Sequence, residues 1–172
     1  MSLESVRAFL AEHAPDLTII DQGRSTATVL EAAETLGVEP GQIAKTLAVR
    51  VGEEVVLVVA RGDARLDNRK TRHAFGARPR MLGHEETQAL TGHPVGGVCP
   101  FGLATSLRVF CDLSLRDFAT VYPAAGSRTA SVALSPARLA ALTGAGWVDV
   151  CQRADATEPS ETPPPPPPPA FP

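Results

Sequence analysis

Several residue types that would point to a particular class of protein are scarce in this chain. Its 172 residues include one Trp, one Tyr and three cysteines, which are Cys99, Cys111 and Cys151. An odd number of widely spaced cysteines without a CxxC pair favours reduced thiols over a disulfide framework. No apolar run approaches the roughly eighteen residues that a membrane span needs. The first residues show neither a basic leader nor a continuous apolar stretch, so we expect no signal peptide and a cytoplasmic protein.

The histidines and cysteines also lack the spacing of a metal site. Four histidines are present, at positions 13, 73, 84 and 93, and they form no HExxH or H-x3-H pattern. We therefore expect no metal and no cofactor. With 44% apolar and 20% charged residues the composition is that of a globular domain. A chain of this length can bury a core without disulfides or metal.

Lysine is rare as well, because the chain has fourteen arginines but only Lys45 and Lys70. Lys45 stands in the apolar stretch GQIAKTLAV, residues 41–49. An arginine-rich chain keeps lysine where a slender point charge is wanted, which favours a functional site. The alternative is a lysine that lies along the core and holds its ammonium in water.

Positive charge is concentrated in one segment, although the net charge of the chain is −3. Residues 61–80 hold seven Lys or Arg and two Asp, so the segment carries +5 and the rest of the chain −8. Such a segment is a candidate phosphate-contacting face, and an ordinary solvated helix face is the alternative. The candidate contacts are Arg65, Arg69, Lys70 and Arg72.

Periodicity and turn residues predict a single α/β domain over residues 1–152. Its sheet is expected to be mixed and largely antiparallel, with helices packed around it. The expected helices are 2–13, 28–37, 67–75, 84–92 and 136–143. The expected strands are 17–20, 46–51, 54–60, 78–82, 107–112, 118–124, 130–135 and 147–150. Residues 153–172 include seven consecutive prolines and are predicted to be a disordered tail.

Two glycine-containing segments are expected to meet Lys45 at one pocket. They are GGVCP, residues 96–100, and PAAGSR, residues 123–128. Adjacent glycines let the backbone approach a ligand, and its N–H groups can hold a carbonyl oxygen on which charge develops. None of these groups is a strong nucleophile, so such a site suits a substrate that supplies its own.

Three stretches of the chain resemble one known family. AAETLGVEPGQIAKTLAV, GGVCPFGL and VYPAAGSRTASVALSP have the order and spacing of the YbaK and prolyl-tRNA-synthetase-associated editing domains, over roughly residues 20–150. The resemblance implies the YbaK-like fold and a trans-editing deacylase. Such an enzyme hydrolyses the ester of mischarged tRNA, most often tRNA(Pro) carrying a small wrong amino acid. It also implies mischarged tRNA, and prolyl-tRNA synthetase, as partners.

The resemblance further implies roles for individual residues. Lys45 matches the family's essential lysine, expected near the terminal adenosine and its phosphate, and the loop 96–100 is expected to hold the aminoacyl carbonyl. The attacking group is then a hydroxyl, a water or a thiol of the substrate. The catalytic candidates are Lys45, Gly96 and Gly97. The substrate-binding candidates are Thr46, Val98, Cys99, Pro100, Ala125, Gly126 and Ser127.

Departures from the family pattern leave the substrate open. Thr46 follows the lysine where the alanine-clearing branch has Asn, and no histidine lies in 123–128. Cys, Ala, Ser, Thr and 2-aminobutyrate all remain candidates. Two other hypotheses also stand: Cys99 as a nucleophile activated by His93, and a non-catalytic module that binds tRNA or a synthetase.

Overall fold

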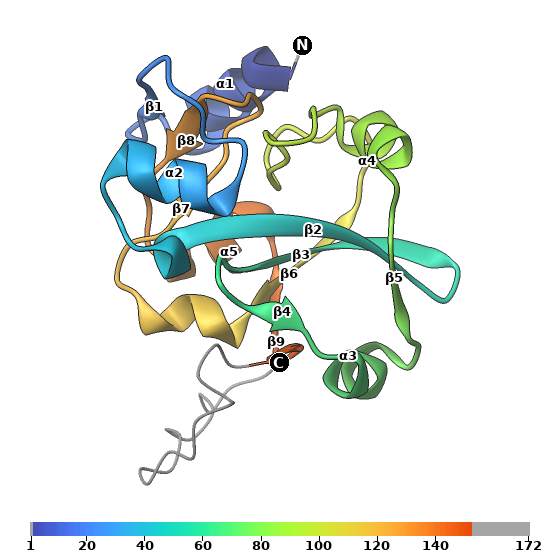
Figure 1. The fold of residues 1–172 in the computed structure, drawn as a ribbon. Coiled ribbons are helices and arrows are strands. Elements are labelled where there is room, and N and C mark those ends of the chain that lie inside the picture. Colours follow the sequence, from blue (N-terminus) through green and yellow to red (C-terminus); the bar gives the residue numbers. More distant parts are fainter. Residues whose placement is uncertain (1, 153–172) are drawn as a thin grey trace, which may run out of the picture.

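The computed structural model describes residues 2–152, and the expected tail lies outside these residues. A central sheet has the strand order β5-β2-β3-β6-β9, with β7 beside β2 (Figure 1). Its strands are β2 (Ile43–Val51), β3 (Glu54–Arg61), β5 (Pro79–Met81), β6 (Arg108–Asp112), β7 (Tyr122–Pro123) and β9 (Gly146–Val148). Two short pairs join β1 (Ile19–Asp21) to β8 (Ala130–Val132) and β4 (Arg65–Leu66) to β10 (Cys151–Gln152).

Five α-helices in the described part surround this sheet (Figure 1). They are α1 (Ser2–His13), α2 (Val29–Leu36), α3 (Asn68–Phe75), α4 (His84–Thr91) and α5 (Pro136–Thr143), and 3-10 turns occupy Pro40–Gln42 and Leu113–Asp117. Among residues 2–152 no helix has the length and apolar character to cross a membrane.

The predicted mixed sheet is confirmed. Strand β2 runs antiparallel to β3 and β5 and parallel to β7, whereas β3–β6 and β6–β9 are parallel pairs. Gly52 and Glu53 form the two-residue hairpin turn that the sequence predicts between β2 and β3. The predicted strand 118–124 was wrong in extent: only β7 within it is a strand, because Phe118 ends a 3-10 turn.

The helix ends follow the cap residues of the sequence. Thr28, Asp67 and Ser135 each accept a hydrogen bond from a first-turn amide of the helix that follows. Gly37 and Gly76 end α2 and α3 in the left-handed conformation that glycine adopts easily. These local signals fix the start of α2, which reaches the cavity described below.

The two faces of β2 belong to different cores. Ala44 and Ala48 pack on one face with α1 and the buried Cys99 and Phe101. Val49 and Val51 pack on the other face with residues of the β4 and β10 region. Since side chains alternate along a strand, neighbouring residues of β2 serve opposite sides of the sheet.

One edge of β2 has a gap. β7 pairs with Ile43 and Ala44, and β5 pairs with residues 49–51. Between them, Lys45 to Leu47 face no strand partner on this edge among the described residues. A strand residue points its N–H and C=O to the same side, and the carbonyl of Ala48 points outward to accept from Leu82 N at 3.2 Å. By alternation the N–H and C=O of Thr46 also point into the gap.

Candidate functional site

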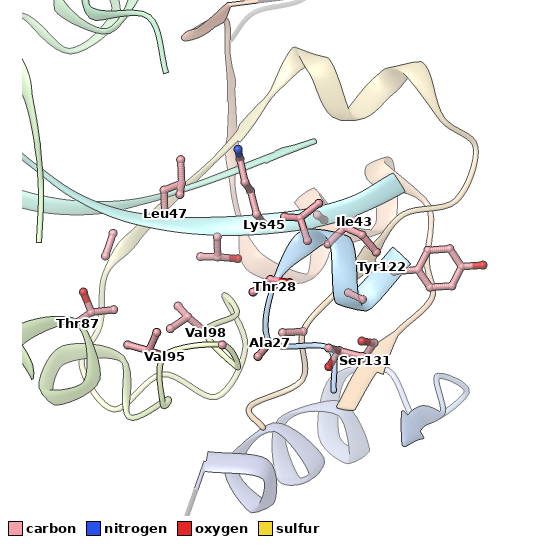
Figure 2. A pocket seen from close by; sticks show the side chains of 18 of the residues that line it. Ala27, Thr28, Ile43, Lys45, Leu47, Thr87, Val95, Val98, Tyr122 and Ser131 are labelled. Atoms are coloured by element: carbon pink, nitrogen blue, oxygen red, sulfur yellow. The ribbon is translucent and has the colours of Figure 1, made fainter. Parts of the chain in front are cut away.

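A cavity of about 400 Å³ lies beside the unpaired edge of β2. Figure 2 shows it between the start of α2, strand β2 and the loop carrying Val95 and Val98. Its lining comprises Thr26, Ala27, Thr28, Val29, Ala32, Ile43, Ala44, Lys45, Thr46, Leu47, Ala48, Met81, Leu82, His84, Thr87, Val95, Gly96, Val98, Tyr122, Ala124 and Ser131. The wall is mainly apolar and contains no carboxylate and no cysteine, which makes it a place for a small, largely uncharged group.

Several hydroxyls of the wall are already bonded to main-chain groups. Thr26 Oγ1 donates to Arg128 O at 3.1 Å, Thr28 Oγ1 accepts from Glu31 N at 3.1 Å, and Thr87 Oγ1 donates to Gly83 O at 2.9 Å. None of these three hydroxyls is bonded to a side-chain base. Within residues 2–152 no three His, Cys, Asp or Glu side chains gather as a metal site. Among the described residues these three hydroxyls are therefore not activated as nucleophiles.

The two adjacent glycines have different roles. A Cβ on Gly97 would lie 2.7 Å from Ser127 N, so this glycine allows the loops 96–100 and 123–128 to touch. Its N–H donates to Pro94 O at 2.8 Å and its carbonyl accepts from Gly126 N at 3.0 Å. Gly97 does not line the cavity. The expectation that both glycines face a ligand is therefore not met for Gly97, which joins the two loops.

Gly96 and Val98 do face the cavity. Gly96 has a φ of +92°, and a Cβ there would come within 2.9 Å of the Ala27 methyl carbon. Its neighbours can thus approach the start of α2 only if residue 96 is glycine. In the described part of the chain neither the Gly96 nor the Val98 amide donates to a protein acceptor. These two N–H groups remain able to hold a carbonyl oxygen of a ligand.

Lys45 contributes to the cavity wall, but its amine does not face the glycine loop, which is the segment 96–100. In Figure 2 the Lys45 and Leu47 side chains point to the side of β2 away from Val95 and Val98. The amine donates to Ala64 O. Burial lowers the pKa of Lys45, and the nearby Asp63 carboxylate acts in the opposite direction. The expected meeting of this amine with the amides of 96–100 is therefore absent from this conformation.

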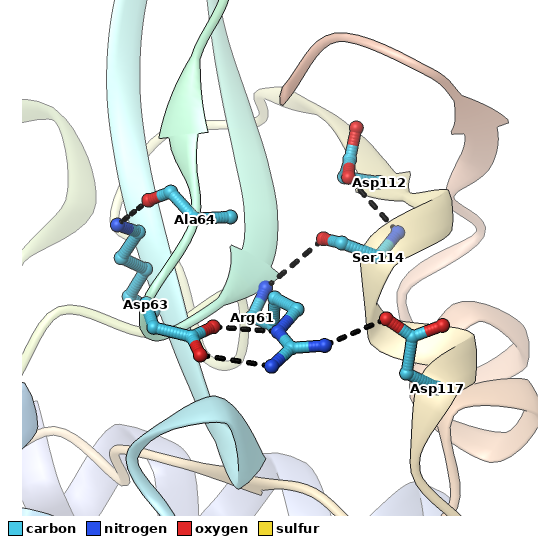
Figure 3. Close-up of polar contacts among 7 residues, drawn as sticks. Arg61, Asp63, Ala64, Asp112, Ser114 and Asp117 are labelled. Atoms are coloured by element: carbon cyan, nitrogen blue, oxygen red, sulfur yellow. Dashed lines mark hydrogen bonds and ion pairs between the residues drawn. The ribbon is translucent and has the colours of Figure 1, made fainter. Parts of the chain in front are cut away.

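A network of polar contacts fixes the turn that holds the amine (Figure 3). The Arg61 guanidinium donates to Asp63 at 2.5 Å and to Asp117 at 2.7 Å, and the Arg61 amide donates to Ser114 Oγ at 3.3 Å. The hydrogen bond from Arg61 holds the pKa of Asp63 below its usual value. These contacts tie the turn after β3 to the 3-10 turn 113–117. The turn presents Ala64 O to the lysine.

Five other predicted residues lie behind the cavity wall rather than on it. Cys99, Pro100, Ala125 and Gly126 are buried and Ser127 is half-buried, and none of the five lines the cavity. Cys99 Sγ lies 3.6 Å from His93 Nε2, but the thiol is fully buried and burial raises its pKa to about 12. A thiol that stays protonated and has no access to the cavity is not an activated nucleophile.

Helix α1 holds the two loops together from behind, a role that the sequence analysis missed. His93 Nε2 lies 2.7 Å from Phe101 O, and His93 Nδ1 lies 2.6 Å from Ser2 Oγ. Ser2 Oγ also lies within hydrogen-bond distance of Gly126 O, and Ser5 Oγ donates to Gly102 O at 3.0 Å. Serines near a helix start usually indicate a cap, so nothing in the local pattern predicted contacts about a hundred residues away.

The basic segment lies away from the glycine loop. Arg65 is on β4, and Arg69, Lys70 and Arg72 are on α3, whose Phe75 packs on the core shared with β4 and β10. Lys70 Nζ donates to Asp149 at 3.0 Å and to Cys151 O at 3.1 Å. The three arginines are exposed and form no ion pair with a described residue.

Of the predicted residues, Lys45, Thr46, Gly96 and Val98 are thus brought to one cavity. The prediction missed the stretch 26–29 before and at the start of α2, two residues of α4, and Tyr122 and Ser131, whereas Ala124 belongs to the segment 123–128 that it named. The cap residue Thr28 was a visible signal for the start of α2. Nothing in the sequence indicated that this helix start would face β2.

Comparisons with known proteins agree with this architecture. The family model described as the aminoacyl-tRNA editing domain matches residues 24–142. YwhH of Bacillus subtilis (strain 168) is 46% identical over 154 residues, which are 88% of this chain and 98% of that protein. A protein of Enterococcus faecalis, provisionally named the Cys-tRNA(Pro)/Cys-tRNA(Cys) deacylase EbsC, is 31% identical over 69% of this chain and 73% of its own length.

Larger enzymes and a solved structure also match. The proline–tRNA ligase of Desulforamulus reducens is 38% identical over 54% of this chain, which spans only 16% of that ligase. A crystal structure described provisionally as a trans-editing enzyme for prolyl tRNA synthetase superposes with a TM-score of 0.81 at 33% identity, covering 88% of this chain and 98% of the other. The cavity, the glycine loop and these relationships lead to one conclusion: the chain belongs to the aminoacyl-tRNA editing domain family, with its YbaK-like fold.

Proposed function

We propose that the protein is a trans-editing deacylase that hydrolyses the ester of mischarged tRNA, and that its substrate is tRNA(Pro) carrying a small non-cognate amino acid. The observation that supports the proposal is the cavity of about 400 Å³, which is lined by Gly96 and Val98 and by Thr46 of β2. Its volume holds a small aminoacyl group with part of the ribose. A synthetase gains little discrimination against a residue smaller by one methylene, so a second, hydrolytic site is needed.

The proposed reaction needs no nucleophile from the protein. The amides of Gly96 and Val98 hold the ester carbonyl oxygen while a water attacks the carbonyl carbon. This water is either free or held by the ribose hydroxyl. The carbon–oxygen bond to the ribose breaks, and the ribose oxygen takes the proton that the water loses. Donors that are fixed before the reaction stabilise the developing oxyanion without reorganisation.

Lys45 is proposed to act at the acceptor end of the tRNA. Lys45 lines the cavity, and its amine donates to the carbonyl oxygen of Ala64, the residue before the exposed Arg65. The terminal phosphate would draw the amine from Ala64 O by rotation of the four-carbon stem. Arg69 and Arg72 on α3 would then contact phosphates further along the stem, with prolyl-tRNA synthetase supplying the mischarged tRNA in the cytoplasm.

The test is a panel of tRNA(Pro) species charged with Ala, Cys, Ser, Thr or 2-aminobutyrate. The wild-type protein should cleave at least one member well above the spontaneous rate. Lys45→Ala should lower that rate by about a hundredfold and keep a native unfolding transition. Lys70→Ala is the matched control, because it removes the other lysine, which is paired with Asp149.

A different result would favour the alternative of a non-catalytic module that binds tRNA or a synthetase. If no panel member is cleaved above the buffer blank while tRNA still binds, the proposed hydrolysis is wrong. If Lys45→Ala and Lys70→Ala behave alike, the role given to Lys45 is wrong.

A further inference from the structure

We propose that the cavity selects an aminoacyl group whose side chain carries a hydroxyl or thiol, and that the Thr46 hydroxyl recognises this group. The inference rests on the proposed function, because the ligand considered is an aminoacyl ester. It narrows the substrate from small amino acids in general to serine, threonine and cysteine.

The Thr46 hydroxyl has no hydrogen-bond partner. Its Oγ1 is buried, and among residues 2–152 no donor or acceptor lies within hydrogen-bond reach of it. A buried hydroxyl without a partner costs free energy, so native proteins seldom keep one without a reason. The hydroxyls of Thr26, Thr28 and Thr87 in the same wall are all bonded to main-chain groups. The exception among these threonines is Thr46.

The position of Thr46 gives this hydroxyl a ligand to meet. Thr46 lines the cavity, and by alternation its side chain lies on the face of β2 opposite Lys45 and Leu47. That is the face of Ala44 and Ala48, which pack toward the core containing Cys99. A rotation about the Cα–Cβ bond exchanges the methyl and the hydroxyl of a threonine, so the oxygen can turn toward an arriving ligand.

The main chain of Thr46 can bind the α-ammonium, which is another polar group of an aminoacyl ester. Its N–H and C=O point into the gap between β5 and β7. Since no carboxylate of the described residues lines the cavity, the acceptors available to the α-ammonium are main-chain and hydroxyl oxygens and a ring nitrogen of His84. If the Thr46 carbonyl receives the ammonium, its hydroxyl is left for the substrate side chain.

This arrangement separates candidate substrates that differ by one hydroxyl. Alanine and 2-aminobutyrate leave Thr46 Oγ1 buried and unpaired, whereas serine and threonine supply the missing partner. A site with a buried hydrogen-bonding group discriminates strongly against the analogue that lacks the group. A thiol is a weaker partner, so cysteine should fall between the two classes.

The experiment compares matched pairs of substrates: seryl- with alanyl-tRNA(Pro), and threonyl- with 2-aminobutyryl-tRNA(Pro). The wild-type protein should prefer the hydroxyl-bearing member of each pair by about tenfold or more. Thr46→Val, which keeps shape and strand preference, should bring both ratios close to one, and Thr46→Ser should restore them. Thr87→Val is the matched control for these ratios, since Thr87 lines the same cavity but its hydroxyl is already bonded to Gly83 O.

Stability supplies a second readout that a structural hydroxyl would not give. Removing an unpaired buried hydroxyl should raise the unfolding midpoint of Thr46→Val, whereas Thr87→Val should leave it equal or lower. Alanyl-tRNA cleaved as fast as seryl-tRNA by the wild type would overturn the inference. An equal loss on all substrates in Thr46→Val would also overturn it, because Thr46 would then bind a part common to all of them.

A binding measurement separates this inference from the proposed function. Non-hydrolysable seryl and alanyl amides of 3′-amino-adenosine are titrated by calorimetry. If the seryl amide binds more tightly and no ester is cleaved, the selection stands and the hydrolysis fails. If esters are cleaved and the two amides bind equally, the hydrolysis stands and the selection fails.

Discussion

The two faces of β2 differ in chemistry although their residues alternate along a single strand. The face of Ala44, Thr46 and Ala48 looks toward the glycine loop and a cavity without carboxylates. The face of Lys45 looks toward Ala64, Asp63 and the arginine-bearing elements β4 and α3. The comparison teaches that neighbouring residues of one strand can serve two purposes: under the proposed function the apolar face would take the aminoacyl group, and the cationic face would take the phosphates of the tRNA.

Gly97→Ala should produce the largest effect, because it disturbs the loops on the cavity side of β2. It should leave the side of Lys45 unchanged. A Cβ would lie 2.7 Å from main-chain Ser127 N, which cannot move without separating the loops 96–100 and 123–128. We expect a loss of unfolding free energy of about 1–3 kcal/mol and little remaining hydrolysis. Chemical denaturation and the deacylation rate measure both.

The matched control for Gly97→Ala is Gly83→Ala. Gly83 precedes α4, and a Cβ there meets no atom within 4 Å. Gly83→Ala should lower the unfolding free energy by only a fraction of the loss expected for Gly97→Ala. Equal losses in the two variants would contradict the view that contact between the loops sets the cavity.

Neutralising the cationic face should weaken the binding of tRNA but leave the rate of ester hydrolysis unchanged. The triple change Arg65→Gln, Arg69→Gln and Arg72→Gln removes exposed charges that have no ion-pair partner in the described part. We expect the affinity for tRNA to fall about tenfold or more and its dependence on salt to flatten. Hydrolysis of an aminoacyl ester of adenosine should stay at the wild-type rate, and equal losses on both substrates would contradict the division between faces.

Local signals in the sequence were sufficient for much of this architecture. The caps Thr28, Asp67 and Ser135 and the Gly52-Glu53 turn act within a few residues, so their consequences could be read without tertiary information. The alternation of β2 was visible too. It could not say which face would receive the glycine loop, because that depends on packing between elements far apart in the chain.

The glycine loop shows the same limit of prediction from the sequence. Its glycines correctly indicated close approach of the backbone, but they could not say what approaches. At Gly97 the partner is Ser127 of the other loop, and at Gly96 it is Ala27 before α2. The contacts of Ser2 and Ser5 with the loops join residues about a hundred positions apart, and no periodic pattern encodes such contacts.

The pH dependence of stability should reveal the buried histidine behind the cavity face. Burial lowers the pKa of His93 from 6.5, so the folded protein keeps this ring neutral while the unfolded chain takes up a proton. Its contribution is present above pH 6.5 and is lost as the pH falls below it. We expect the unfolding midpoint of the wild type to drop between pH 7 and 5. The midpoint of His93→Gln should drop less over that range. An unchanged slope in His93→Gln would contradict the assignment.

Asp63→Asn should give the smallest effect, on the cationic face. Asp63 is a partly exposed partner of Arg61, and such a pair contributes less than about 1 kcal/mol. Because Arg61 lowers the pKa of Asp63 from 3.8, the contribution is present above pH 3.8 and is lost as the pH falls further. The difference in unfolding midpoint between wild type and Asp63→Asn should therefore shrink in acid, whereas a difference that stays constant from pH 7 to 3 would mean that Asp63 acts by packing. Asp117→Asn, which removes the other carboxylate bonded to Arg61 but leaves the turn beside Lys45 intact, shows whether the effect belongs to that turn.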